Sequence, residues 1–164
     1  MGPLIAAIVL TGFAGASIAA EIGTMVVGEE IEALEAHALN PIRFLVVPRV
    51  IATVISLVLL TVLADVAAVV SSGLISTLFL GVGTQVYIDS TLSQLDPSDF
   101  FSGMVKALVF GVILASIACY NGLKVTGGAA GVGKATTDTV VQTVVLIIVA
   151  DMIFGVLFLK LGWT

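Results

Sequence analysis

Residues 18–52 read IAAEIGTMVVGEEIEALEAHALNPIRFLVVPRVIA, a polar island between two apolar runs. Five glutamates and a proline-containing turn follow one stretch that is almost pure hydrocarbon, and a second such stretch begins before the island ends. A compact polar loop with a short amphipathic helix is more often a docking element than a linker in a membrane protein. The fold therefore depends on what lies on either side of this island.

The whole chain has the composition of an integral membrane protein. Of its 164 residues, 59% are hydrophobic and only 10% are charged, whereas a soluble domain needs a far more polar surface. The net charge of −5 and the six basic residues exclude a phosphate-binding stripe, so we expect no nucleic-acid partner. The single cysteine excludes a disulfide framework, and the single histidine argues against hydrolytic chemistry.

Four stretches are long enough to cross a bilayer, which takes about 20 apolar residues in a helix. We therefore expect an all-α, polytopic membrane helix bundle in a single domain. Its four transmembrane helices are predicted at residues 3–20, 44–72, 100–120 and 139–159. Residues 73–98 are half apolar and predict an extension of the second span followed by an interfacial helix, and Pro97 fits the first turn of the third span.

The basic residues predict the orientation, because Lys and Arg concentrate in cytoplasmic loops. The loops at 21–43 and 122–137 contain basic residues, while the connection at 73–99 contains aspartates but neither Lys nor Arg. We therefore place 21–43 and 122–137 in the cytoplasm and 73–99 outside. This order also leaves the N-terminus outside, from which we expect the natural chain to begin earlier, with at least one more span.

A short amphipathic helix is predicted at residues 29–38. Gly28 is an acceptable N-cap, glutamates in the first turn suit the helix dipole, and Asn40-Pro41 ends the helix. Its apolar and acidic faces indicate insertion into a basic-rimmed groove on a cytoplasmic protein. The alternative is a helix on the membrane surface, although anionic headgroups repel glutamates. The candidate docking residues are Glu29, Glu30, Ile31, Glu32, Leu34, Glu35 and His37.

Three ionisable residues, Asp65, Lys106 and Asp151, lie within the predicted spans. At about 1.5 Å per residue, all three reach a similar depth in the outer half of the bilayer. Charges at that depth are costly unless they are paired or hydrated. We predict that Lys106 pairs with one or both aspartates, or that the three line a polar cavity. A structural salt bridge and a substrate-contacting cavity both stay open.

Small residues recur at every fourth position and permit close helix packing in lipid. One stripe lies in the third span and two lie in the first: Gly103, Ala107, Gly111 and Ala115; Gly12, Ala16 and Ala20; Gly15, Ala19 and Gly23. We expect packing within the chain more than between copies.

Residues 128–134, GAAGVGK, match the GxxxxGK pattern of a nucleotide-binding loop. We reject this interpretation, because Ala135 replaces the hydroxyl that would hold magnesium and no strand precedes the motif. A tight cytoplasmic turn is expected instead.

Two groups of residues carry a family resemblance. In the island they are 19–25 (AAEIGTM), 29–35 (EEIEALE), Asn40-Pro41 and 45–49 (LVVPR); in the second loop they are 122–123 (GL), 127–133 (GGAAGVG) and 135–137 (ATT). Together they resemble the MlaE/YrbE permeases, which are membrane subunits of ABC transporters that work with MCE-domain proteins. The resemblance covers nearly the whole chain and makes residues 1–164 a single MlaE-like permease domain.

The resemblance implies a homodimer in the bacterial inner (cytoplasmic) membrane. The segment at 29–38 would be a coupling helix that docks on an MlaF-like ATPase, and MlaD-like MCE proteins would sit on the periplasmic side. The complex would move phospholipid between the inner membrane and periplasmic MCE-protein carriers and so maintain outer-membrane lipid asymmetry. The chain itself would be non-catalytic and hold no cofactor, with ATP and magnesium in the partner ATPase.

Two departures from the family accompany the resemblance. The family has five spans and an N-terminal interfacial helix, so one span and that helix are missing before residue 3. Phe13 also stands where many relatives carry an arginine. The alternative function is an ion-coupled secondary transporter using Asp65, Lys106 and Asp151. A third possibility is a membrane-anchoring subunit without a transport path.

Overall fold

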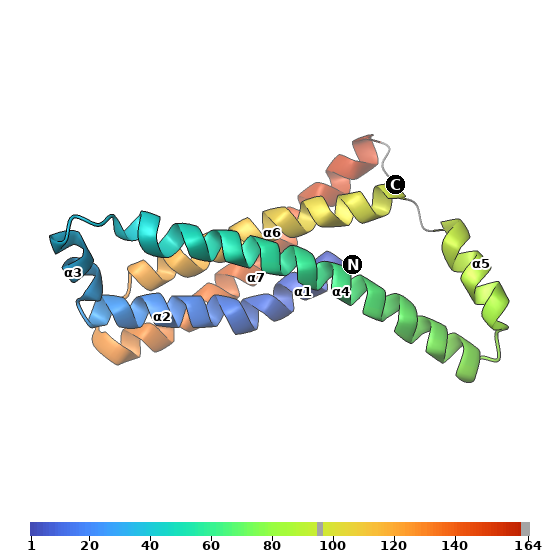
Figure 1. Cartoon of the computed structure of the whole chain (residues 1–164), viewed down its shortest axis with the longest axis horizontal. Coiled ribbons are helices and arrows are strands. Elements are labelled where there is room, and N and C mark those ends of the chain that lie inside the picture. Colours follow the sequence, from blue (N-terminus) through green and yellow to red (C-terminus); the bar gives the residue numbers. More distant parts are fainter. Residues whose placement is uncertain (95–96, 162–164) are drawn as a thin grey trace.

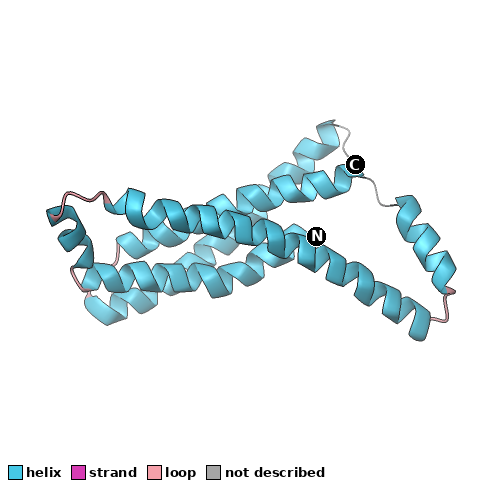
Figure 2. Ribbon diagram, viewed as in Figure 1, coloured by secondary structure: helices cyan, strands magenta, loops and turns pink. Residues whose placement is uncertain are grey.

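The computed structural model describes residues 1–94 and 97–161 and forms an elongated helical bundle (Figures 1 and 2). All the regular elements in these ranges are helices (Figure 2). Among the described residues, four helices are long and apolar enough to cross a membrane: Gly2–Val27, Ile42–Leu78, Ser98–Leu123 and Gly128–Lys160. The predicted all-α, multi-pass membrane bundle is therefore confirmed, although each span is longer than its apolar run indicated.

The first span consists of α1 (Gly2–Leu10), a π-helical turn η1 (Thr11–Gly15) and α2 (Ala16–Val27). It continues past the predicted end at residue 20, because the charge of Glu21 is carried on an exposed side chain and does not interrupt the helix. The π-helical turn lies where the span changes neighbours. Before the turn, α1 packs mainly on α4 and α6; after it, α2 packs mainly on α6 and α7.

The short helix α3 (Glu30–Ala36) is shorter than the predicted 29–38. Glu29 is its N-cap, with a left-handed φ of 58°, so the assignment of the N-cap to Gly28 was wrong; Gly28 instead ends α2. At the other end, Ala38 also has a φ of 58°. The amide of Ala38 donates to the carbonyl of Glu35 (2.9 Å) and that of Leu39 to the carbonyl of Leu34 (3.1 Å). These two bonds form a Schellman motif that ends α3. Ala38, which lies within the predicted helix 29–38, is therefore outside the helix and not part of its apolar face.

The second span begins with a side-chain cap. The Asn40 Oδ1 atom accepts a hydrogen bond from the amide of Ile42 at 3.0 Å and a longer one from the amide of Arg43 at 3.4 Å. Asn40-Pro41 therefore starts the second span, whereas the sequence had indicated only that it ends the helix before it. The span then runs through a π-helical segment, η2 (Ile42–Val46), into α4 (Val47–Leu78).

The predicted helical extension and separate helix in residues 73–98 are both present. α4 continues to Leu78, and α5 (Thr84–Gln94) folds back toward it (Figure 1). The Tyr87 hydroxyl joins the two helices, because it lies 2.6 Å from the Ser72 Oγ atom and donates to the carbonyl of Val69 at 2.9 Å. The Tyr87 ring lies against Gly73, where a Cβ atom would be only 2.9 Å from it.

The last two spans are α6 (Pro97–Leu123) and α7 (Gly128–Leu161), and α6 begins at Pro97 as predicted. α7 begins well before the predicted residue 139, so residues 128–137 are helical and not part of a loop. Gly127 and Gly128 have φ values of 87° and 68°, which allow a turn of only a few residues. The residues in the first turns of α7 are small or polar, so the runs of apolar residues that indicated the spans do not include them.

The core is built by all four spans and centres on α6. Its buried residues are Ala6, Ala7, Leu57, Phe110 and Ile147. Glycines let the backbones approach closely: a Cβ atom on Gly111 would lie 2.9 Å from the Cα atom of Val54, and one on Gly122 would lie 2.8 Å from the Cβ atom of Ile22. The small-residue stripe of the third span therefore packs within the chain, as expected.

The two predicted cytoplasmic loops lie at the same end of the bundle. Figure 1 shows α3 and the turn before α7 at one end, and α5 with the C-terminal end of α7 at the other. The two loops therefore share one side of the membrane, and the assignment of that side to the cytoplasm stays a prediction from the basic residues. Toward the second end, α4 diverges from α6 and α7 (Figure 1).

We predict that Gly122→Ala destabilises the bundle by about 1–3 kcal/mol, because the added methyl group would separate α2 from α6. The control is Gly155→Ala in α7, where a Cβ atom meets nothing within 4 Å; helix propensity should make that change neutral or stabilising by up to about 1 kcal/mol. Thermal unfolding of the detergent-solubilised protein measures both. Equal midpoints for the two variants would contradict the close packing described here.

Candidate functional site

Lys106 on α6 and Asp151 on α7 form an ion pair inside the spans. The Lys106 Nζ atom lies 3.0 Å from the Asp151 Oδ1 atom, and the two side chains are 21% and 29% exposed. The ammonium group also lies 5.6 Å from the centre of the Phe158 ring. The structure thus pairs two of the three intramembrane charges. The sequence had predicted such pairing, because the three residues lie at a similar depth in different spans.

Asp65 on α4 shares a cleft with this pair. The cleft has a volume of about 610 Å³ and is lined by residues of α1, α4, α6 and α7. Its charged lining residues are Asp65, Asp99, Lys106 and Asp151, and Phe100 and Val69 add apolar surface. The Asp65 carboxylate lies against Gly2, the first residue of α1. Asp99 had been treated only as part of the acidic connection, because its place in the cleft depends on the direction that α6 takes.

Three carboxylates and one ammonium group therefore line the same cleft, next to exposed apolar side chains. A cleft with this lining suits an amphipathic ligand, because charged and apolar parts of one molecule would both find matching surface. The arrangement offers neither a nucleophile paired with a base nor an oxyanion hole among the described residues, so it fits binding better than covalent chemistry.

The candidate docking residues surround α3 at the opposite end of the bundle. Glu29, Glu30, Glu32, Glu35 and His37 are exposed, whereas Ile31 and Leu34 are half-buried. Two grooves flank the helix. One, of about 530 Å³, includes Ile31, Glu35 and residues 38–42; the other, of about 300 Å³, includes Glu30, Leu34 and His37. The helix therefore presents a carboxylate-rich surface with apolar grooves beside it.

A second ion pair lies near this segment and was not anticipated from the sequence. The Arg49 Nη2 atom on α4 lies 3.0 Å from the Glu21 Oε2 atom on α2. The sequence had indicated Glu21 only as part of the family motif, and Arg49 as part of that motif and as one of the basic residues that predict the orientation. Opposite charges on the consecutive spans α2 and α4, on either side of α3, were a usable signal. The rotation of each helix about its own axis was also needed to predict the contact.

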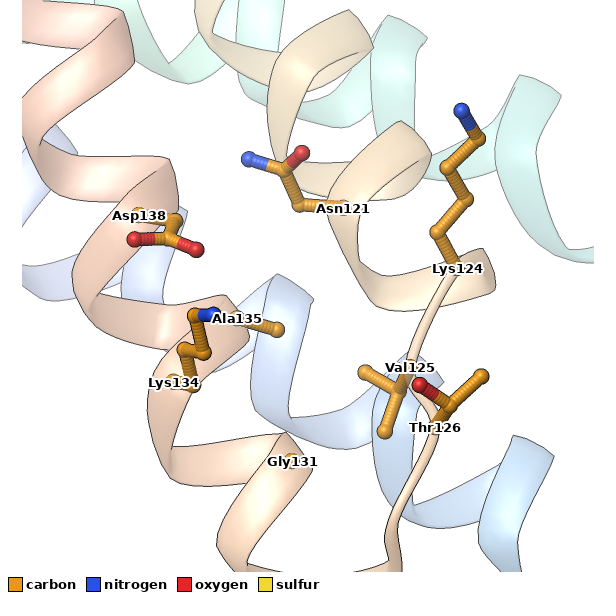
Figure 3. Close-up of a pocket in the computed structure, with 8 residues that line it drawn as sticks. All are labelled: Asn121, Lys124, Val125, Thr126, Gly131, Lys134, Ala135 and Asp138. Atoms are coloured by element: carbon orange, nitrogen blue, oxygen red, sulfur yellow. The ribbon is translucent and has the colours of Figure 1, made fainter.

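A small polar pocket of about 220 Å³ lies beside the turn before α7 (Figure 3). Lys134 and Asp138 line it from α7, while Lys124 extends away from them (Figure 3). The Lys124 ammonium group lies 4.3 Å from the centre of the Tyr120 ring. The GxxxxGK residues begin α7, and a Cβ atom on Gly131 would clash with the carbonyl of Thr126. This helical geometry supports the rejection of a nucleotide-binding loop.

Beside this pocket, polar side chains join α6 to α7. The Asn121 amide donates to the Thr139 hydroxyl at 3.1 Å and to the Gln142 side-chain oxygen at 3.0 Å. Such interhelical bonds hold neighbouring spans together in lipid. The pocket is thus a feature of the packing between α6, α7 and the turn that joins them.

Comparison with known proteins gives a consistent family. Residues 1–157 match the family model described as Permease MlaE. The chain is 41% identical over 160 residues to a probable ABC transporter permease protein of Rickettsia prowazekii, covering 98% of this chain and 62% of the relative. It is 39% identical over 151 residues to a probable ABC transporter permease protein of Synechocystis, covering 92% of this chain and 57% of the relative.

A plant protein is also similar. The chain is 39% identical over 160 residues to the chloroplastic protein TRIGALACTOSYLDIACYLGLYCEROL 1 of Arabidopsis thaliana, covering 98% of this chain and 46% of the relative. The chain spans about three fifths of the length of the Rickettsia relatives that it matches, at 62% of each.

We predict that Asp151→Asn lowers the free energy of unfolding by about 1–3 kcal/mol, because it leaves the Lys106 ammonium group unpaired in a partly buried place. Exchanging the two residues, Lys106→Asp with Asp151→Lys, should recover part of the loss. Asp65→Asn is the control, since no ion pair with Asp65 is found among the described residues. Unfolding in mixed micelles measures the free energy of unfolding of the three variants. A larger loss of stability in Asp65→Asn than in Asp151→Asn would contradict a stabilising role of the Lys106–Asp151 pair.

Proposed function

The chain belongs to the MlaE permease family, and on that basis we propose that it is the membrane-spanning subunit of an ABC transporter that moves phospholipid. The transport would run between the inner membrane of a bacterium and periplasmic MCE-protein carriers, and would maintain the lipid asymmetry of the outer membrane. The names of the Rickettsia and Synechocystis relatives support an ABC permease. The Arabidopsis relative is named after a glycerolipid, which supports a lipid substrate.

In this proposal the chain works as a homodimer and leaves catalysis to a partner. A separate MlaF-like ATPase on the cytoplasmic side binds ATP and magnesium and hydrolyses the ATP. MlaD-like MCE proteins meet the periplasmic side near α5. The chain contributes the path and the mechanical link between these two sides, and no reaction is assigned to its own residues.

The exposed acidic helix α3 is the observation that carries the proposal. It lies between the first and second spans, so that force applied to it reaches α2 on one side and α4 on the other. Its glutamates suit a basic rim on the ATPase, and the apolar grooves beside it can take apolar side chains. Movement of the ATPase would therefore be passed to both spans.

The cleft at the other end suits the substrate. Lys106 can attract the phosphate of a phospholipid headgroup, while the carboxylates can attract an amine such as that of ethanolamine. The exposed apolar residues of the diverging end of α4 provide surface for acyl chains. A charged and apolar cleft open toward the periplasmic side is the place where we expect lipid to pass.

The Lys106–Asp151 pair keeps ion-coupled secondary transport as the second candidate, because paired charges within spans are common in proton and ion pathways. That function gives α3 no role. Purification from native membranes separates the two candidates. A stoichiometric ATPase that remains bound supports the ABC permease, whereas no ATPase together with proton-driven uptake supports the secondary transporter.

We predict that Glu32→Lys and Leu34→Asp reduce lipid transport at least about tenfold, because each change disrupts a face of α3 that would contact the ATPase. The variants should still insert into the membrane. Lys160→Glu is the control, since it changes the charge of an exposed side chain in the last turn of α7, at the opposite end of the bundle. Transport and ATP hydrolysis are measured together in proteoliposomes, and wild-type transport in both α3 variants would remove the coupling role from this helix.

A further inference from the structure

The Glu21–Arg49 ion pair joins two helices that otherwise pack mainly on others. α2 packs chiefly on α6 and α7, and α4 packs chiefly on α6, with α1 against its outer part. The 3.0 Å contact between the Glu21 carboxylate and the Arg49 guanidinium therefore bridges α2 and α4 directly. It does so near their cytoplasmic ends, beside α3 (Figure 1).

The position of the pair relative to α3 gives it a mechanical meaning. The chain leaves α2 after Val27, forms α3, and re-enters the membrane through η2 and the start of α4. Glu21 precedes α3 in the sequence and Arg49 follows it, so the ion pair joins the two helices that flank the α3 segment. α3 itself packs on α2, and its two ends are short turns at Glu29 and Ala38.

The burial of Arg49 makes the pair more than a surface contact. The Arg49 side chain is 23% exposed, and its Nη1 atom is buried with no hydrogen-bond partner among the described residues. Glu21, by contrast, is 63% exposed and reaches the guanidinium from the solvated side. Without Glu21 a mostly buried guanidinium would lose its carboxylate, and a buried unpaired charge is costly. Separation of α2 from α4 would leave the Arg49 guanidinium unpaired, and the cost of this unpaired charge favours keeping the two helices together.

We propose that Glu21 and Arg49 form a positioning clamp at the base of the coupling segment. The clamp makes α2 and α4 move together when α3 is displaced, so that the displacement is not absorbed by the turns at either end of α3. This inference rests on the proposed function, because it assigns a regulatory contact to the same coupling segment. Neither residue has to touch ATP, lipid or the ATPase.

The first test measures phospholipid transferred per ATP hydrolysed, in proteoliposomes that contain the ATPase partner. Glu21→Gln and Arg49→Gln should each lower this ratio roughly five- to tenfold, the scale of a typical coupling between sites, while the ATPase stays bound. The charge exchange, Glu21→Arg with Arg49→Glu, should restore most of the ratio. Lys134→Gln, which neutralises an exposed charge on α7, is the matched control and should leave the ratio unchanged.

Two outcomes would overturn the clamp. One is a wild-type ratio in both single variants. The other is a reduced ratio that the charge exchange leaves as low as in the single variants, since the pairing itself would then not be the cause. A structural role alone would lower the amount of folded protein without changing the ratio per ATP, and that result would also count against the proposal.

A second test does not depend on transport. Cys119 is the one cysteine of the chain, so Cys119→Ala provides a background for spin labels at Ala36→Cys on α3 and Thr137→Cys on α7, both at exposed positions. Adding Glu21→Gln should broaden the distance distribution between the labels, and an unchanged distribution would overturn the clamp. If the wild-type chain binds no ATPase and moves no phospholipid, the proposed function fails, while this distance measurement still decides on the clamp.

Discussion

Close approach of helix backbones around α6 is the constraint on which the rest of the bundle depends. Lipid provides no hydrophobic force between apolar helices, so their association relies on packing and on a few polar contacts. Gly111 and Gly122 let α4 and α2 approach α6 at two levels, and Phe110 of α6 is buried in a core cluster with Leu57 and Ile147. Because α6 occupies the centre, α2 and α4 lie on it rather than on each other, and side chains must provide any direct link between them.

Charge is used at both ends of this bundle and for different purposes. At the end that carries α5, Lys106 and Asp151 join α6 to α7 and share a cleft with two further carboxylates. At the end that carries α3, Arg49 joins α4 to α2, and the glutamates of α3 are exposed. The apolar middle of the spans contains threonines that bond to their own helix, such as Thr61 to the carbonyl of Leu57 at 2.8 Å, and so add no charge to the hydrocarbon region.

The sequence predicted the features that follow from runs of apolar residues and from the position of a residue along a helix. The four spans, the helix after the second span and the shared level of Lys106 and Asp151 belong to this group. It did not predict the early start of α7, whose first turns are polar, or the left-handed Ala38, where glycine is the usual residue. It also missed the Glu21–Arg49 contact and the place of Asp99, because both depend on how neighbouring helices are rotated and tilted, which periodic patterns do not reveal. The docking role of α3 stays a prediction from charge and family resemblance.

The π-helical turn in the first span has a consequence for how this segment can change over evolution. A π-helical turn accommodates extra chain within an otherwise α-helical span, and each residue of an α-helix accounts for a rotation of about 100°. Because the π-helical turn takes up the extra residue locally, loss of a single residue between Thr11 and Gly15 would leave a regular α-helix with α2 close to its present orientation relative to α1. Glu21 would then still face Arg49, whereas the same loss in the regular helix between Ala16 and Glu21 would rotate Glu21 by about 100°. Homologous chains should therefore tolerate a change of one residue in the length of this five-residue segment better than in the regular helix that follows it.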